Sequence, residues 1–452
     1  MVACVTGGLV VTPDGVRGGD VRIEDGLVAE VLPPGLPRDD AVAADGCYVL
    51  PGGVDPHTHL FTDVAAATRS AAFGGTTTAI SFTLPRPGES PAETVARTRD
   101  ELIPQAAIDV ALHAYVSEPD RLTADDVEEC AQLGVVGVKL FTAYPELGLQ
   151  ASDRTVYETM RATRSLDLSV LVHCENGGVI AALADELRAA GRSDPLAFAE
   201  SRPPESEVEA IARVLAIAGI AGGRVYVVHI STKGGVDAVR GARRRRVDVT
   251  AEACSHHLAL DASVYDRADA ARYLTVPPFR AREHVEALWT AVRDGTIDTI
   301  GSDHAQIRFQ PKPETDDFTG LAYGLAGVEA RLPVLLSLGH ERGVPLERLV
   351  ELVATGPARR FGLYPSKGVL APGADADLVV WDPHAEWTVE ASSFHDGSAD
   401  TPYDGFRLRG RVRYVIRSGE LLVAEGELVG APAGRYLASR QTAAAEPEPA
   451  PV

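Results

Sequence analysis

The stretch from Asp109 to Phe141 contains one complete unit of the fold. It begins with the apolar run Asp109-Val-Ala-Leu-His-Ala-Tyr115 and continues through Thr123-Ala-Asp-Asp126 to a second apolar run, Val135-Val-Gly-Val-Lys-Leu-Phe141. A threonine followed three positions later by an acidic residue is typical of a helix N-terminus. Two short apolar runs joined by a helix predict a pair of parallel strands, because parallel strands need a long crossover connection.

The same alternation extends on both sides of this unit, from about Pro51 to Gly301. A second helix is expected to start at Ser90-Pro-Ala-Glu93 and to run to Leu102. The apolar runs number eight in all and are Tyr48–Asp55, Thr76–Phe82, Asp109–Tyr115, Val135–Phe141, Ser169–His173, Arg224–Ile230, Val247–Glu252 and Ile297–Gly301. Eight parallel strands separated by helices predict an α/β fold, a closed (β/α)8 TIM-like barrel.

Both chain ends have β character and are expected to meet in one small β-sandwich domain. The N-terminal part alternates polar and apolar residues around Asp25-Gly26, which predicts a hairpin, and similar runs occur at Ala376–Trp381 and Val412–Val429. The expected division is residues 1–50 and 361–437 for the sandwich, 51–360 for the barrel, and 438–452 for a Pro- and Glu-rich disordered tail.

Composition limits the classes of partner. The chain has 452 residues, 45% of them hydrophobic, so it can bury a large core. Its net charge of -21, with no basic stripe to offset it, argues against binding of nucleic acid. The short run Arg243–Arg246 fits a solvated helix-to-strand connection and is given no functional weight.

Cysteine usage and the N-terminal segment favour an unexported protein. The five cysteines are scattered without paired spacing, which indicates reduced thiols rather than a disulfide framework. Residues 1–8 lack a basic stretch followed by a long apolar one, and no uncharged apolar run reaches membrane-spanning length. We therefore expect a cytoplasmic protein without membrane association.

The titratable side chains at the expected strand ends form one concentrated set. In a (β/α)8 barrel, reactive groups gather at the face where the strands end. The candidates there are His57, His59, Lys139, His173, His229 and Asp303. Histidines two positions apart in an extended strand point to the same side and can hold one cation. That pair alone is weak evidence, because histidine is common in cores and on surfaces, but four histidines at one barrel mouth predict a metal centre.

Lys139 is the unusual member of this set. An ammonium in so apolar a strand would be desolvated and repelled by metals, and it has no lone pair to offer them. A carbamate formed with CO2 would be an anion whose two oxygens can bridge two cations. The ordinary alternative is a lysine with a buried stem and a solvated amine, but the four histidines favour the carbamate. Asp303 is expected to bind metal and face substrate, the alternative being a solvated loop residue.

Several segments together resemble the hydantoinase and dihydropyrimidinase family of cyclic amidohydrolases. They are Gly52-Gly-Val-Asp-Pro-His-Thr-His-Leu60, Val138-Lys-Leu-Phe-Thr-Ala-Tyr144, Val172-His-Cys-Glu-Asn-Gly177, Val228-His-Ile-Ser231, Gly301-Ser-Asp-His-Ala305 and Ser201-Arg-Pro-Pro-Glu205. The resemblance extends from about Gly46 to Val429. It implies hydrolysis of a hydantoin or dihydropyrimidine ring to an N-carbamoyl amino acid.

The resemblance also implies roles for the candidate residues. Two divalent metal ions with a hydroxide between them would be held, the first by His57, His59, Lys139 and Asp303 and the second by Lys139, His173 and His229. Zinc suits these ligands, although manganese, cobalt or iron could occupy the same set. Asp303 would accept and return the proton, and Tyr144 would donate to the developing oxyanion. The family further implies a homotetramer.

A few positions depart from the family pattern and bear on the substrate. Val276 stands where relatives have a serine before two prolines, and Tyr323 where they have an asparagine. These positions hold the ring amide chiefly through backbone groups in relatives, so both remain candidate substrate-binding residues. Leu60 and Phe61 follow the histidine pair where dihydroorotases place an arginine, which disfavours dihydroorotate. Allantoin remains an alternative substrate.

A non-catalytic assembly protein of the same fold is the competing class, because some members of this family have lost metal ligands. This chain keeps all six candidate ligands together with Tyr144. That retention favours an enzyme that acts on a small cyclic amide.

Overall fold

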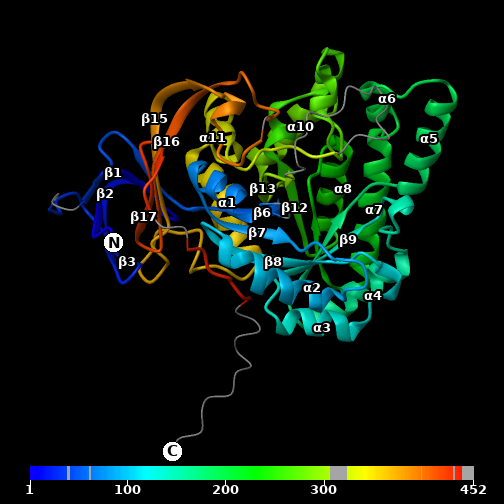
Figure 1. Ribbon diagram of the computed structural model, residues 1–452, viewed down its shortest axis with the longest axis horizontal. Coiled ribbons are helices and arrows are strands. Elements are labelled where there is room, and N and C mark those ends of the chain that lie inside the picture. Colours follow the sequence, from blue (N-terminus) through cyan, green and yellow to red (C-terminus); the bar gives the residue numbers. More distant parts are fainter. Residues whose placement is uncertain (38–40, 61–62, 306–322, 399, 431–432, 440–452) are drawn as a thin grey trace, which may run out of the picture.

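The computed structural model describes residues 1–37, 41–60, 63–305, 323–398, 400–430 and 433–439. Figure 1 shows a barrel wrapped by helices and, at one side of it, a β-sheet module built from both ends of the chain. Phe61 lies outside the described residues, as does the predicted tail 438–452 apart from Ala438 and Ser439.

The barrel is a parallel sheet. Its strands are β6 (Gly53–His59), β7 (Thr76–Phe82), β8 (Asp109–Tyr115), β9 (Gly137–Phe141), β10 (Ser169–His173), β11 (Arg224–Val227), β12 (Val249–Cys254), β13 (Thr299–Gly301) and β14 (His304–Ala305). They pair in the order β13-β12-β11-β10-β9-β8-β7-β6-β14. Only Ser302 and Asp303 separate β13 from β14, so the pairing of β14 with β6 brings the sheet back to its first strand. The predicted (β/α)8 barrel is confirmed.

Helices cover the outside of the barrel (Figure 1). They are α1 (Val64–Phe73), α2 (Pro91–Arg97), α3 (Ala124–Gln132), α4 (Asp153–Arg164), α5 (Gly177–Ala189), α6 (Pro195–Glu200), α7 (Pro204–Ala221), α8 (Lys233–Arg244), α9 (Ser255–Ala259), α10 (Arg282–Asp294), α11 (Arg331–Glu341), α12 (Leu346–Val350) and α13 (Gly356–Arg360). Ser90 and Thr123 cap α2 and α3 as predicted, each in a reciprocal capping box. A π-helical turn carries α2 on to Leu102. Within the described ranges, no helix has both the length and the apolar character needed to cross a membrane.

Strand alternation decides which side chains enter the barrel. Val138 and Leu140 belong to the core between the strands and the outer helices, so Lys139 between them faces the barrel interior. Leu171 belongs to the interior core, and the same alternation brings His173, two residues later, to the interior side as well. The apolar floor of the barrel therefore lies directly beneath the polar side chains at its mouth.

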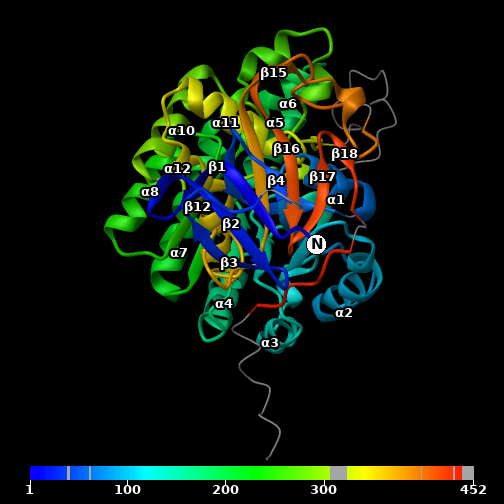
Figure 2. The ribbon, with the colours of Figure 1, turned by 90° about the vertical axis from the view of Figure 1, so that its left-hand side faces the viewer.

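The module of the chain ends is a mixed sheet that folds around one core. Its strands are β1 (Cys4–Thr12), β2 (Gly15–Glu24), β3 (Leu27–Leu32), β4 (Ala41–Ala43), β5 (Tyr48–Pro51), β15 (Leu378–Thr388), β16 (Arg407–Arg417), β17 (Glu420–Ala424) and β18 (Glu427–Leu428). The predicted hairpin joins β2 to β3 through Asp25 and Gly26, both at positive φ. Val21 and Val380, from opposite ends of the chain, share the core, and Figure 2 shows both ends contributing to this face.

One predicted strand differs from the structure. The run Tyr48–Asp55 was expected to form the first barrel strand, but Tyr48–Pro51 is β5 of the chain-end sheet and the barrel strand begins only at Gly53. A Cβ on Gly52 would collide with the side chain of Thr77, so only glycine fits at the crossing. The backbone N–H of Gly52 donates to the carbonyl of Asp377, next to the chain-end strand β15. The backbone N–H of Gly53 donates to the carbonyl of Gly75, next to the barrel strand β7. The chain changes sheet between these two residues.

Candidate active site

All nine residues singled out from the sequence line one pocket at the mouth of the barrel. The pocket has a volume of about 320 Å³, and the nine are His57, His59, Lys139, Tyr144, His173, His229, Val276, Asp303 and Tyr323. They come from the ends of barrel strands and the loops that follow. The structure thus brings together side chains that are up to 266 positions apart, from His57 to Tyr323.

Asp303 joins the two histidines of β6. Its Oδ1 lies 2.9 Å from His57 Nε2 and 3.2 Å from His59 Nε2. Burial opposes the charge on this carboxyl group, but His57 and His59 outweigh it and hold the pKa of Asp303 well below its usual range. An anionic oxygen and two imidazole nitrogens converge here, which is a donor set suited to a divalent cation.

His173 and His229 form the other half of the site. His173 Nδ1 lies 2.9 Å from His229 Nε2, and each residue is only 3% exposed. The opposite nitrogen of His173, Nε2, lies 2.8 Å from Glu175 Oε2. Burial, together with the neighbouring His173, lowers the pKa of His229 well below its usual value. A neutral imidazole has a free lone pair, so this pair also fits a cation.

Lys139 lies between the two halves and is 1% exposed. Its Nζ is 4.9 Å from the ring centroids of both Phe82 and Phe141, and no described residue gives the ammonium a hydrogen bond or salt bridge. Burial lowers the pKa of Lys139 to about 8, against the opposing charges of Asp303 and Glu252. A larger share of neutral amine follows, and the neutral amine is the form that reacts with CO2.

The donor set as a whole suits divalent cations. The ligand atoms of His57, His229 and Asp303 all lie within 4.8 Å of one another, and the two remaining histidines flank them. These donors are nitrogen and oxygen atoms on inward-facing side chains, the chemistry that such ions prefer. Among the six ligand candidates, Lys139 is the one that offers no ligand atom in its ammonium form.

Three of the non-glycine residues at positive φ line this pocket, and the others lie elsewhere in the fold. Tyr144, His229 and Asp303 have φ values of 64°, 37° and 48°, in the left-handed region that residues other than glycine seldom occupy. For His229 the reason is geometric. Val228 already belongs to the interior core, so regular alternation would turn the next side chain outward. The positive φ instead turns His229 toward His173.

The three candidate substrate-binding residues form the wall around the metal-ligand candidates. The ring of Tyr144 lies 5.2 Å from that of His173, and burial raises the pKa of its hydroxyl well above the usual value, so it stays a proton donor at neutral pH. Tyr323 stacks on Phe198 with ring centroids 4.8 Å apart. Val276 is 9% exposed and lines the same pocket.

Sequence reasoning gave no role to three buried charged residues behind the ligands: Glu252, Glu175 and Arg202. Glu252 Oε1 lies 2.6 Å from His57 Nδ1. Arg202 donates to the Glu175 carboxylate at 3.1 Å, and its guanidinium lies 5.8 Å from the Tyr144 ring centroid. Glu252 had a detectable signal, since it is the lone acidic residue in the apolar run Val249–Cys254.

A group of thiol and imidazole side chains is buried beside the pocket. The potential ligand atoms of Cys254, His256 and His257 lie within 4.8 Å of one another. His257 Nε2 donates to the carbonyl of Pro277 at 3.0 Å, which gives that ring a structural bond. All five cysteines are free, in line with the reduced thiols that the scattered spacing predicted, and all five are buried.

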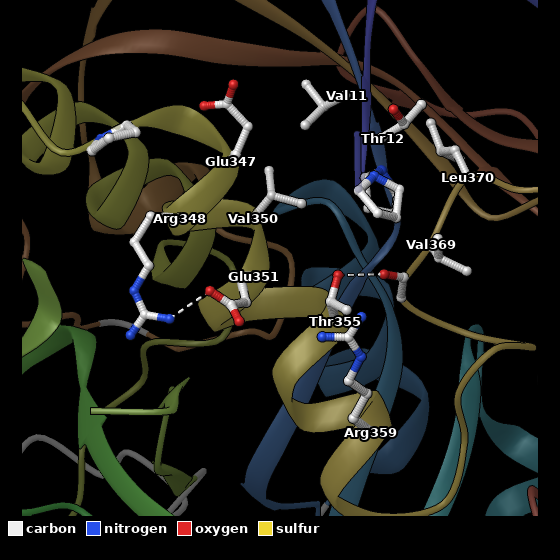
Figure 3. Close-up of a pocket in the computed structure, with 14 residues that line it drawn as sticks. Val11, Thr12, Glu347, Arg348, Val350, Glu351, Thr355, Arg359, Val369 and Leu370 are labelled. Atoms are coloured by element: carbon white, nitrogen blue, oxygen red, sulfur yellow. Dashed lines mark hydrogen bonds and ion pairs between the residues drawn. The ribbon is translucent and has the colours of Figure 1, made fainter. Parts of the chain in front are cut away.

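A different cavity, of about 560 Å³, lies between the chain-end sheet and the helices α12 and α13 (Figure 3). Its charged side chains include Arg348, which donates to Glu351 at 2.6 Å, and the hydroxyl of Thr355 donates to the carbonyl of Gly368 at 2.7 Å. Its lining contains no histidine and none of the nine candidates. Volume alone therefore does not locate the chemistry.

Comparisons with known proteins place the chain among amidohydrolases. The model of the amidohydrolase family matches residues 48–422. A D-hydantoinase from Ralstonia pickettii is 36% identical over 97% of this chain and 98% of its own length. A solved D-hydantoinase structure superposes with a TM-score of 0.93 at 35% identity, covering 98% of this chain and 100% of that one. A dihydropyrimidinase from Brevibacillus agri gives 0.91 at 33% identity, covering 97% and 98%.

The match by sequence and the match by structure each span nearly the whole chain, and the candidate residues lie in the barrel that both include. The chain belongs to the amidohydrolase family, in its hydantoinase and dihydropyrimidinase branch.

Proposed function

We propose that this protein hydrolyses a ring amide bond of a hydantoin or dihydropyrimidine and releases an N-carbamoyl amino acid. The observation that carries the proposal is the convergence of His57, His59, Lys139, His173, His229 and Asp303 with Tyr144 in one pocket. The names of its relatives, D-hydantoinase and dihydropyrimidinase, support the same reaction.

The ligand assignment divides the donors between two cations. His57, His59, Asp303 and a carbamate formed on Lys139 would hold one, and His173, His229 and the same carbamate would hold the other. When bound, two divalent cations activate a water molecule and polarise the scissile carbonyl. We assign zinc because nitrogen and oxygen ligands at a buried site suit it.

Asp303 and Tyr144 carry the proton and charge transfers in this proposal. The depressed pKa of Asp303 keeps it a carboxylate, so it is ready to accept the proton of the attacking water and to return it to the leaving ring nitrogen. Tyr144 keeps its proton and donates a hydrogen bond to the carbonyl oxygen as negative charge develops there. The Tyr144 ring lies against both the Arg202 guanidinium and the His173 ring, which limits the positions that it can take.

The rim of the pocket favours an apolar substituent on the ring. Leu84 and Leu147 line the pocket and are 48% and 65% exposed, and Leu149 lies beside them. Among the described lining residues, Lys139 is the sole cationic side chain, so the carboxylate of dihydroorotate has no arginine to bind there. The polar ureido group of allantoin fits this rim less well than an aryl or alkyl group, because its polar atoms would lose water without new partners.

We also assign a homotetrameric assembly and a cytoplasmic location, by likeness to the family and from the scattered cysteines. Light scattering coupled to gel filtration tests the first. A mass near that of the 47.8 kDa chain would contradict it.

A hydrolysis panel tests the proposed activity. The zinc-loaded protein is incubated with 5-phenylhydantoin, hydantoin, dihydrouracil, allantoin and dihydroorotate, and the ring-opened products are followed by mass spectrometry. We expect turnover of a hydantoin or dihydrouracil, with the aryl substrate preferred, and none of dihydroorotate. Absence of any turnover, with two metals per chain verified, would contradict the proposal.

A further inference from the structure

We propose that Glu252 is a positioning residue that aligns one ligand of each metal through a single carboxylate. The inference rests on the proposed ligand assignment. Glu252 lies on β12 with 0% exposure, so it touches neither solvent nor substrate. Its role is therefore exerted through the groups that donate to it.

One oxygen of Glu252 serves both halves of the site. Oε1 accepts from His57 Nδ1 at 2.6 Å and from the backbone N–H of His229 at 2.9 Å. In the proposed ligand assignment, the first bond keeps an imidazole proton of His57 on Nδ1, so that Nε2, 2.9 Å from Asp303, is the nitrogen that would face the metal. The second holds the backbone of His229, whose φ of 37° turns its ring toward His173.

The other oxygen anchors the carboxylate itself. Tyr226 donates its hydroxyl proton to Glu252 Oε2 at 2.7 Å, and Thr299 in turn lies 2.6 Å from the same hydroxyl. A Cβ on Gly301 would lie only 3.1 Å from Oε2 and 2.9 Å from the Cβ of His57. Glycine at position 301 therefore leaves the space in which Glu252 and His57 meet.

Two substitutions separate the contributions of charge and hydrogen bonding. Glu252→Gln keeps an oxygen that can accept from His57 and His229, whereas Glu252→Leu removes both acceptors. We expect zinc to be released to a chelator about 10-fold faster from the first variant and about 100-fold faster from the second, in proportion to the 10–100-fold loss of metal affinity that is typical when a supporting residue is removed. In turnover, kcat should fall while KM changes little, because Glu252 does not contact substrate.

Thr250→Val is the matched control. It lies on the same face of the same strand, two residues earlier, and is also buried. Its release rate should equal that of the wild type. Thermal unfolding of the metal-free proteins shows whether each variant folds. If Glu252→Leu does not fold, the comparison of Glu252→Gln with the wild type is the test.

The outcomes distinguish this inference from the proposed function. If the wild type binds no metal, the ligand assignment fails and this inference fails with it. If the wild type binds two metals and turns over substrate, but both Glu252 variants release metal at the wild-type rate, the positioning role alone is overturned. A folded Glu252→Gln variant that releases zinc faster than Thr250→Val supports it.

Discussion

The ammonium of Lys367 lies 2.6 Å from a carboxylate oxygen of Asp109, and both side chains are fully buried. Asp109 begins the barrel strand β8, and it also accepts from Arg417 on β16 at 3.1 Å and from Arg435 at 2.8 Å. Lys367 further binds Asp377 at 2.8 Å. This ionic cluster joins the barrel to the chain-end module.

Removing Lys367 should destabilise the protein strongly. Lys367→Met leaves Asp109 and Asp377 buried with one cation fewer, and breaking a buried ion pair costs about 3–5 kcal/mol. Lys233→Met is the control, since Lys233 is 62% exposed and its pair with Asp237 contributes at most about 1 kcal/mol. Urea unfolding curves measure both variants, and equal losses would show that the cluster contributes no more than a surface pair.

The ion pair of Lys367 with Asp109 also predicts how the free energy of unfolding depends on pH. Burial opposes the charge on Asp109, but Lys367 and Arg435 outweigh it and depress the pKa of its carboxyl group. The stabilisation is therefore present above the unfolded-state pKa of about 4 and is lost as pH falls toward the folded value. The difference in unfolding free energy between wild type and Lys367→Met should shrink below about pH 4. A difference independent of pH would contradict this.

The barrel could be predicted because its signals are local. Each signal is contained in a few consecutive residues, whether it is a short apolar run, a capped helix start or a histidine at a strand end. The structure places every candidate residue in one pocket. A division between residues 50 and 51 was expected, but the pairing of Tyr48–Pro51 within the chain-end sheet could not be predicted. Both sides of Gly52 are apolar, and Tyr48–Pro51 pairs with β1 on one side and on the other with β15, more than three hundred residues away.

The supporting residues of the site were missed for the same physical reason. The bond of Glu252 to His57 joins side chains 195 positions apart, and no periodicity in the sequence reports it. The inward turn of His229 depends on a positive φ that its residue type does not reveal. Local patterns therefore indicated the ligand candidates, whereas the contacts that orient them required the fold.

Replacing Asp303 with asparagine should separate metal binding from turnover. Asn keeps an oxygen toward His57 and His59 but cannot take up the proton, so kcat should fall about 10²–10⁴-fold while much of the zinc stays bound. Steady-state kinetics and metal analysis measure the two effects. Near-normal turnover would mean that another base acts. Asp237→Asn, which alters an exposed carboxylate, controls for the substitution.

Tyr144→Phe should lower kcat about 10²–10³-fold with little change in KM, because a donor to the developing oxyanion acts mainly in the transition state. Tyr115→Phe removes a hydroxyl from the same pocket wall and should cost less than about tenfold in kcat. Equal effects of the two variants on kcat would assign Tyr144 to the wall rather than to the chemistry.

Lys139 provides the decisive test of the bridging assignment. Its amine is buried without a described partner, and its lowered pKa favours the neutral form that combines with CO2. The new N–C bond forms as the nitrogen loses a proton, so the product is an anionic carbamate. Native mass spectrometry in bicarbonate buffer should therefore show the added mass of one CO2 on the metal-loaded wild type, and peptide analysis should place it on Lys139.

Lys139→Ala removes the anion that the two cations would share. Zinc affinity should fall by at least about 10–100-fold, the loss typical for a merely supporting residue, and activity should fall with it. The barrel should still fold, because Val138 and Leu140 keep their packing against the outer helices. Added acetate or propionate, a short carboxylate that fits the vacated space, should restore part of both metal content and turnover, whereas neutral acetamide should not. The bridging assignment would be wrong if the wild type bound two metals while Lys139 was demonstrably unmodified. It would also be wrong if Lys139→Ala kept full metal content and activity.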